Sequence, residues 1–267
     1  MALLLFLCAL VILYLFLIRG RSGHKELSKL RKWRYAHRGL HGNEAPENSM
    51  SAFCNAVNAG YGIELDVHLM QDGNLAVLHD GSLKRTAGTD VLIEDLSAAD
   101  LERYPLQGME ETIPMLHQVL SMVQGRVPLI VELKSTVANY QTLCEKVFAL
   151  LDRYDGLYCV ESFDPRCVLW LKKNRPSVIR GQLAQNFFLI DSPLPWFLKF
   201  ALQHHLFNAF TKPDFIAYCF SDRHNLSNFL CRKLWGMQGV CWTIRSADAL
   251  SQAEKEGWIS IFENFKP

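Results

Sequence analysis

Short apolar runs alternate with amphipathic stretches along the chain from Lys32 to its end. Eight of the runs have the length and apolar content of buried β-strands: residues 33–37, 62–69, 128–134, 157–163, 178–184, 214–220, 239–244 and 258–264. Amphipathic stretches separate most of them, and the clearest are residues 49–59, 114–124, 138–153 and 246–256. Alternating β and α units predict a parallel sheet.

Eight such units within about 235 residues predict a closed (β/α)8 barrel, or TIM barrel, which typically needs about 250 residues. A doubly wound open sheet is the alternative architecture. Residues 75–80 follow the turn sequence QDGN and are expected to form a hairpin with the second run. Because no repeat or inner linker interrupts the pattern, residues 33–267 are predicted to form a single domain.

The N-terminus breaks the pattern, because residues 2–18 form one uninterrupted apolar run. As a helix this run would be about 25 Å long, slightly short of a hydrocarbon core of about 30 Å. Basic residues dominate the next stretch, and positive charges stay on the cytoplasmic side of a membrane. We therefore expect a transmembrane helix in residues 1–20, a basic segment in residues 21–32 that lies against anionic headgroups, and a cytoplasmic domain. A cleaved signal peptide is the alternative, but no charge precedes the run and no small-x-small cleavage site follows it.

Composition limits the partners and the cellular compartment. The 267 residues are 49% hydrophobic and carry a formal net charge of +1, which argues against a nucleic-acid partner held by general electrostatics. The eight cysteines are scattered, and no two have the CxxC spacing of a zinc or redox site. They are interpreted as small core residues with free thiols, which suits a reducing compartment.

Polar residues stand at the ends of several predicted strands, where the sites of (β/α)8 barrels lie. The first run ends in His37 and Arg38, and the hairpin ends in His79. The second run carries Glu64 and Asp66 at a spacing of two, which puts both on one face of the strand. Glu132 and Lys134 share a face in the same way, and the fourth run ends in Glu161, Ser162 and Phe163.

The three carboxylates of Glu64, Asp66 and Glu132 would repel one another at a barrel mouth unless they were neutralised. Bound cations are one remedy, and pairing with Arg38 and Lys134 is the other. Hard oxygen ligands favour Mg²⁺ or Ca²⁺ over a soft metal. Two histidines at neighbouring strand ends can supply acid–base chemistry near neutral pH, and together with three acids they favour the metal site.

Four segments in order resemble the glycerophosphodiester phosphodiesterases: AHRGLHGNEAPENS (36–49), GIELDVHLMQDGNLAVLHD (62–80), LIVELK (129–134) and SFDP (162–165). The apolar N-terminus resembles that of membrane-associated bacterial members. The resemblance covers nearly all of residues 33–267 and implies a TIM barrel. It also implies hydrolysis of glycerophosphodiesters to glycerol 3-phosphate and an alcohol.

The resemblance assigns roles to particular residues. It implies an acid–base pair, His37 and His79, and three ligands of Mg²⁺ or Ca²⁺, Glu64, Asp66 and Glu132. It implies three substrate-binding residues: Arg38, Lys134 and Trp242. Glu47 and Asn48 match an element that shapes the metal shell. Many members end in a threonine–aspartate pair, whereas this chain ends in FENFKP, which leaves the role of the last strand open.

Residues 186–210 are rich in aromatic residues and leucine and carry few charges. Ordinary helix packing is one interpretation. An apolar rim that rests on a membrane or grips an acyl chain is the other, and it makes lysophospholipids alternative substrates, cleaved as by a lysophospholipase D. A non-catalytic, membrane-bound binding protein is a further alternative, against which the intact histidines and acids count.

Overall fold

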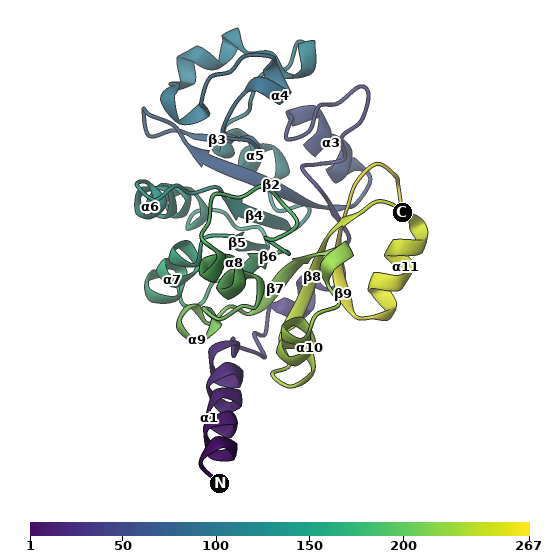
Figure 1. Cartoon of the computed structure of the whole chain (residues 1–267). Coiled ribbons are helices and arrows are strands. Elements are labelled where there is room, and N and C mark those ends of the chain that lie inside the picture. Colours follow the sequence, from purple (N-terminus) through teal and green to yellow (C-terminus); the bar gives the residue numbers. More distant parts are fainter.

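The computed structural model describes residues 1–267, and its core is a closed ring of eight parallel strands (Figure 1). The ring contains β1 (Tyr35–Ala36), β2 (Gly62–Leu69), β4 (Leu129–Leu133), β5 (Tyr158–Ser162), β6 (Arg180–Ala184), β7 (Phe215–Cys219), β8 (Gln238–Ile244) and β9 (Trp258–Phe262). β1 pairs with both β2 and β9 and so closes the ring. The predicted (β/α)8 barrel is confirmed, and the open sheet is excluded.

The predicted hairpin is also present, because β3 (Leu75–Val77) pairs antiparallel with β2. The four predicted helical stretches form α3 (Met50–Asn58), α5 (Leu116–Val123), α6 (Tyr140–Leu151) and α11 (Ala247–Lys255). The remaining helices are α1 (Ala2–Leu17), α2 (Leu27–Leu30), α4 (Lys84–Ala87), α7 (Pro165–Asn174), α8 (Trp196–Gln203), α9 (Asn208–Thr211) and α10 (Leu226–Lys233). Short 3-10 helices cover residues 93–95, 98–103, 106–108 and 220–222.

The period of two along β2 separates the core from the site. Ile63, Leu65 and Val67 point outward into the apolar layer shared with the helices. The alternate residues Glu64 and Asp66 therefore face the barrel interior. This period explains how one strand can bury apolar side chains on one face and carry acids on the other.

The amino-terminal half of the barrel interior is filled by apolar side chains, including Tyr35, Ile130 and Phe215. Leu27 and Leu30 of α2 pack against this cluster and are almost fully buried. The basic segment therefore supplies core residues in addition to surface charge. Since this end of the barrel is closed by packing, the opposite end, where the strands finish, is left for polar groups.

α1 corrects the prediction of a transmembrane helix. It is 16 residues long, so it extends about 24 Å, against a hydrocarbon core of about 30 Å. None of the helices in the structure has the length and apolar character needed to cross a membrane. The helix ends where Ile18 enters the fold, buried against Ile216, Cys231 and Met237.

Candidate active site

The chain makes a sharp turn directly after β1, and this turn sets the first part of the site. Arg38 and Gly39 both have left-handed backbone conformations, with φ of 54° and 80°. A Cβ atom on Gly39 would lie 2.8 Å from the carbonyl carbon of Ala52, so only glycine fits there. Asn48 N–H donates to the Arg38 carbonyl oxygen at 2.9 Å, and the Ser49 side chain caps α3 by accepting from Ala52 N–H.

Three predicted metal ligands meet at the carboxyl ends of β2 and β4. The carboxylate oxygens of Glu64, Asp66 and Glu132 lie within 4.8 Å of one another, and all three residues are buried. Asp66 and Glu132 are direct partners in the parallel pairing of the two strands. The sequence prediction that these acids share one place is therefore correct in its geometry.

Basic side chains accompany the acids, as the alternative interpretation of the sequence expects. Lys134 Nζ lies 2.7 Å from Glu132 Oε1 and 3.0 Å from Asp66 Oδ1. Arg38 Nε lies 3.6 Å from Asp66 Oδ2, and Asn48 donates to the same oxygen at 2.9 Å. The backbone N–H of Arg38 donates to Glu64 Oε2 at 3.0 Å. Ion pairing and a bound cation are thus compatible at this site.

The acids exceed the positive charge that faces them. Burial raises the pKa of Glu64 well above its usual range, and the charges of Asp66 and Glu132 raise it further. Burial also raises the pKa of Glu132 to about 7, against the opposing effect of Lys134. Asp66 Oδ1 faces Lys134 without a well-directed hydrogen bond, and buried Glu161 Oε2 has no partner. Unsatisfied, buried carboxylate oxygens are the donor set that suits a hard divalent cation, so the residues fit the predicted metal.

Each predicted catalytic histidine has a carboxylate on one ring nitrogen. His37 Nδ1 donates to Glu263 Oε2 at 2.5 Å, and His79 Nδ1 donates to Asp80 Oδ1 at 2.6 Å. The other nitrogen of His37 lies 3.9 Å from Glu64. Burial lowers the pKa of His37, although Glu263 opposes this, and burial lowers the pKa of His79 to about 4. Both imidazoles are therefore mainly neutral near pH 7.

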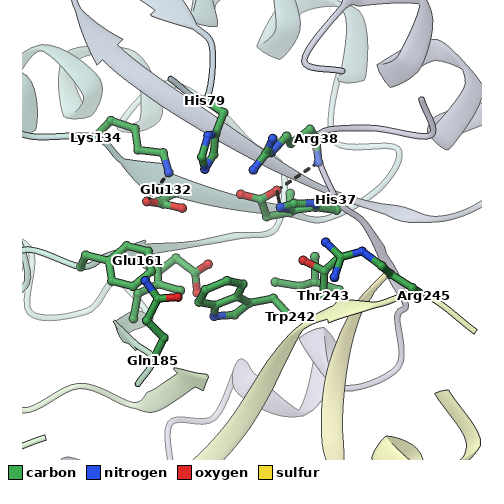
Figure 2. Close-up of a pocket in the computed structure, with 14 residues that line it drawn as sticks. His37, Arg38, His79, Glu132, Lys134, Glu161, Gln185, Trp242, Thr243 and Arg245 are labelled. Carbon is green, nitrogen blue, oxygen red and sulfur yellow. Dashed lines mark hydrogen bonds and ion pairs between the residues drawn. The ribbon is translucent and has the colours of Figure 1, made fainter. Parts of the chain in front are cut away.

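These side chains surround a cavity of about 370 Å³ at the open end of the barrel (Figure 2). His79 and Lys134 approach it from one side, and Trp242 and Arg245 approach it from the other. Of the eight predicted site residues, seven line the cavity: His37, Arg38, Glu64, His79, Glu132, Lys134 and Trp242. The eighth, Asp66, is only 1% exposed and is not among the lining residues.

Trp242 forms a wall of the cavity, as the resemblance implies. Its ring packs edge-on against Phe163, with the centroids 5.8 Å apart. Its indole Nε1–H is buried without a hydrogen-bond partner, so it remains available to a polar ligand.

Two further acids belong to the site. Glu161 stands at a predicted strand end without an assigned role, and Glu263 was not predicted from the sequence. Glu263 directly follows β9 and accepts from His37 and, at 2.7 Å, from Arg245 Nε. The same rule that found the other acids, a polar residue at the end of a barrel strand, would have found it. A further residue in the surroundings is Arg85, which donates to Glu47 and Asp80 and so supports the loop that carries Arg38.

The fold and the site define an α/β-barrel protein that carries buried acids, two histidines bonded to carboxylates, and the basic side chains of Arg38 and Lys134 at the carboxyl ends of its strands. The sequence profile of the Glycerophosphoryl diester phosphodiesterase family matches residues 37–265. The chain belongs to this family.

Relatives and solved structures agree with the family. The chain is 40% identical over 130 residues to a glycerophosphodiester phosphodiesterase of Bacillus altitudinis, covering 45% of this chain and 52% of the relative. It is 33% identical over 159 residues to the human lysophospholipase D GDPD1, covering 55% and 48%. The chain thus spans about half the length of these relatives. An Oleispira antarctica phosphodiesterase structure shares the fold, with a TM-score of 0.70, 22% identity and coverage of 86% of this chain and 92% of that one.

Proposed function

We propose that the protein hydrolyses glycerophosphodiesters to glycerol 3-phosphate and an alcohol, with a divalent cation and two histidines. The observation that carries this proposal is the meeting of Glu64, Asp66 and Glu132 with His37 and His79 in one cavity. Family membership supports the reaction class. The Oleispira antarctica phosphodiesterase was solved with the product sn-glycerol-3-phosphate, which supports the product proposed here.

Phosphate binding falls to the basic side chains of the cavity. Arg38 and Lys134 both line it, and both are partly exposed and paired with acids that hold them in place. Their charges would neutralise the phosphodiester and stabilise the negative charge that develops on its oxygens. Glu64, Asp66 and Glu132 would hold the cation, which when bound acts as a Lewis acid on a phosphoryl oxygen.

Proton transfer is assigned to the histidines. Glu263 is ionised, because the hydrogen bond from His37 and the charge of Arg245 hold its pKa below the usual range despite partial burial. A carboxylate on Nδ1 leaves Nε2 of His37 free to accept a proton and stabilises the imidazolium that forms. We therefore assign His37 as the general base. His79 is assigned as the acid: it first takes up a proton at its free ring nitrogen, which the bound phosphodiester anion favours, and then protonates the leaving alcohol. The nucleophile is either water or the substrate's own glycerol hydroxyl.

A second candidate substrate class, the lysophospholipids, is favoured by a groove next to the cavity. The groove has a volume of about 810 Å³ and shares His79, Glu132, Lys134 and Phe163 with the cavity. Its apolar walls come largely from the α8 region: Phe187, Leu194, Leu198, Leu202 and Phe207. An acyl chain on the glycerol could leave the site along this wall. The name of the human relative, lysophospholipase D, supports this candidate.

One assay separates the candidates. The purified full chain is freed of metal with a chelator, supplied with Mg²⁺ or Ca²⁺, and tested with glycerophosphocholine and lysophosphatidylcholine. The phosphodiesterase proposal expects cation-dependent turnover of glycerophosphocholine that is absent in Glu64→Gln. Turnover of the lysophospholipid alone would favour the second candidate. No turnover of either substrate, with the cation bound, would favour a non-catalytic binding protein.

The cytoplasmic location of the domain also remains a proposal. It rests on the eight cysteines, all of which are free thiols, as suits a reducing compartment. Protease added to intact spheroplasts should leave the domain uncut, whereas it should cut the domain after lysis.

A further inference from the structure

The N-terminal helix leaves an apolar surface open on every side. All side chains from Met1 to Leu13 are exposed, and Leu3 and Ile12 are 71% and 68% exposed. No residue of α1 is buried, and in Figure 1 the helix projects away from the barrel. A helix that is apolar all round has no polar face to turn to water. Contiguous apolar surface of this kind marks an interaction site.

Three basic side chains gather at the foot of this helix, from three distant segments, and are called here the collar: Arg19, Lys172 and Lys212. Lys212 Nζ donates to the Arg19 carbonyl oxygen at 3.0 Å, and Lys172 Nζ donates to the Phe210 carbonyl oxygen at 2.7 Å. The Arg19 guanidinium lies over the ring of Trp235, 4.8 Å from its centroid. None of the three forms an ion pair with a carboxylate.

The collar is therefore a group of like charges without a counter-ion. Partial burial lowers the pKa of Lys212, and the positive charges of Arg19 and Lys172 lower it further. Lys212 also holds a left-handed backbone conformation, with φ of 47°, that glycine adopts with less strain. The mutual repulsion of these charges would be reduced if an anion bound there.

We propose that α1 enters a lipid bilayer and that Arg19, Lys172 and Lys212 bind the phosphate of an anionic lipid headgroup at its surface. Charge complementarity selects the occupant, because an acidic membrane surface meets an unpaired basic collar next to an apolar helix. Tyr14 and Trp235 flank the foot of the helix, and such aromatic side chains favour the headgroup level. This lipid site lies outside the catalytic cavity and does not depend on the proposed reaction.

Flotation of the purified full chain with vesicles tests the collar. The vesicles contain either phosphatidylcholine alone or phosphatidylcholine with phosphatidylglycerol. The wild type should bind both and should prefer the anionic vesicles at low salt. The double variant Lys172→Gln with Lys212→Gln should lose about fivefold per lysine in affinity for the anionic vesicles only. The matched control, Lys146→Gln with Lys173→Gln, removes two exposed lysines of α6 and α7 and should keep the wild-type preference.

A second variant tests the helix. Leu4→Asp with Ile12→Asp changes only exposed positions, so it should fold normally and lose binding to both vesicle types. Thermal unfolding, not turnover, shows that each variant is folded, which keeps the result separate from the proposed activity. Equal binding of the collar variant and the wild type to anionic vesicles would overturn the headgroup site. A lipid-independent dimer through α1 without vesicle binding would overturn the whole proposal.

Discussion

The imidazole of His37 and the carboxylate of Glu263 share a hydrogen bond of 2.5 Å, although 226 positions separate them in the chain. The contact exists because β1 pairs with β9, with Ala36 opposite Phe262. Each of the two residues is the first after its strand, so closing the barrel brings the two together. Glu263 thereby fixes the ring nitrogen that carries the proton, and it orients the other nitrogen toward the cavity.

Replacing Glu263 with glutamine should lower kcat about 10- to 100-fold, the usual effect of removing a carboxylate behind a functional histidine. Glu263 raises the pKa of His37 against the lowering effect of burial. Its loss should therefore shift the acidic limb of the rate–pH profile to lower pH. A fall in kcat with an unshifted profile would mean that Glu263 only supports the fold. Glu254→Gln, which breaks an exposed ion pair with Arg34, serves as the control.

Cation binding should release protons near pH 7. Burial raises the pKa of Glu132 to about 7 and that of Glu64 well above normal, while a hard cation requires ionised carboxylates. Calorimetric titration with Mg²⁺ or Ca²⁺ in two buffers of different ionisation enthalpy measures this release. Glu64→Ala and Asp66→Ala should abolish binding and turnover. Full turnover in excess chelator would contradict the metal site.

The barrel and most of its site could be predicted from local patterns. The spacing of two in Glu64 and Asp66 is a property of any strand, and alternating β and α units favour a barrel. The hydrogen bond between His37 and Glu263 depends instead on the pairing of β1 with β9 when the ring closes. The residues around either position do not indicate this pairing. The prediction of a transmembrane helix in residues 1–20 was wrong, and here too the tertiary structure decides. Ile18 packs into the fold and so ends the exposed helix.

His37→Ala and His79→Ala should each reduce turnover by about 10²- to 10⁴-fold, the usual contribution of general acid–base catalysis. Both side chains line the cavity, and neither belongs to an apolar core cluster, so the variants should unfold at nearly the wild-type temperature. His117→Ala, on the exposed side of α5, should keep normal turnover. Near-normal turnover of the His37 variant would show that His37 takes no part in the proposed reaction.

Glu256→Gln should destabilise the fold by about 2 kcal/mol at pH 7, because Arg223, a buried residue, loses a charged hydrogen-bond partner. Hydrogen bonds from Arg223 lower the pKa of Glu256 from 4.5 to about 2. The ionised form is thus favoured in the folded state, so its stabilisation is complete above about pH 5 and is lost as the pH falls from 4.5 to 2. Urea unfolding at several pH values should show the two proteins converging over that range. A constant difference down to pH 2 would exclude this carboxylate as the cause.

Leu198→Asn should distinguish the two proposed substrate classes. Leu198 lines the apolar groove beside the catalytic cavity, and a polar side chain there would weaken contact with an acyl chain but leave a glycerol headgroup untouched. We expect kcat/KM for lysophosphatidylcholine to fall about tenfold or more, the effect of losing one to two methylene contacts, and that for glycerophosphocholine to stay unchanged. Leu189→Asn, an exposed change in the same segment, should affect neither substrate.

The wild-type rate should also increase with the length of the acyl chain, and this dependence should weaken in the Leu198 variant. Equal losses on both substrates would mean that the substitution distorts the catalytic cavity, and no loss on either would mean that the acyl chain does not occupy the groove.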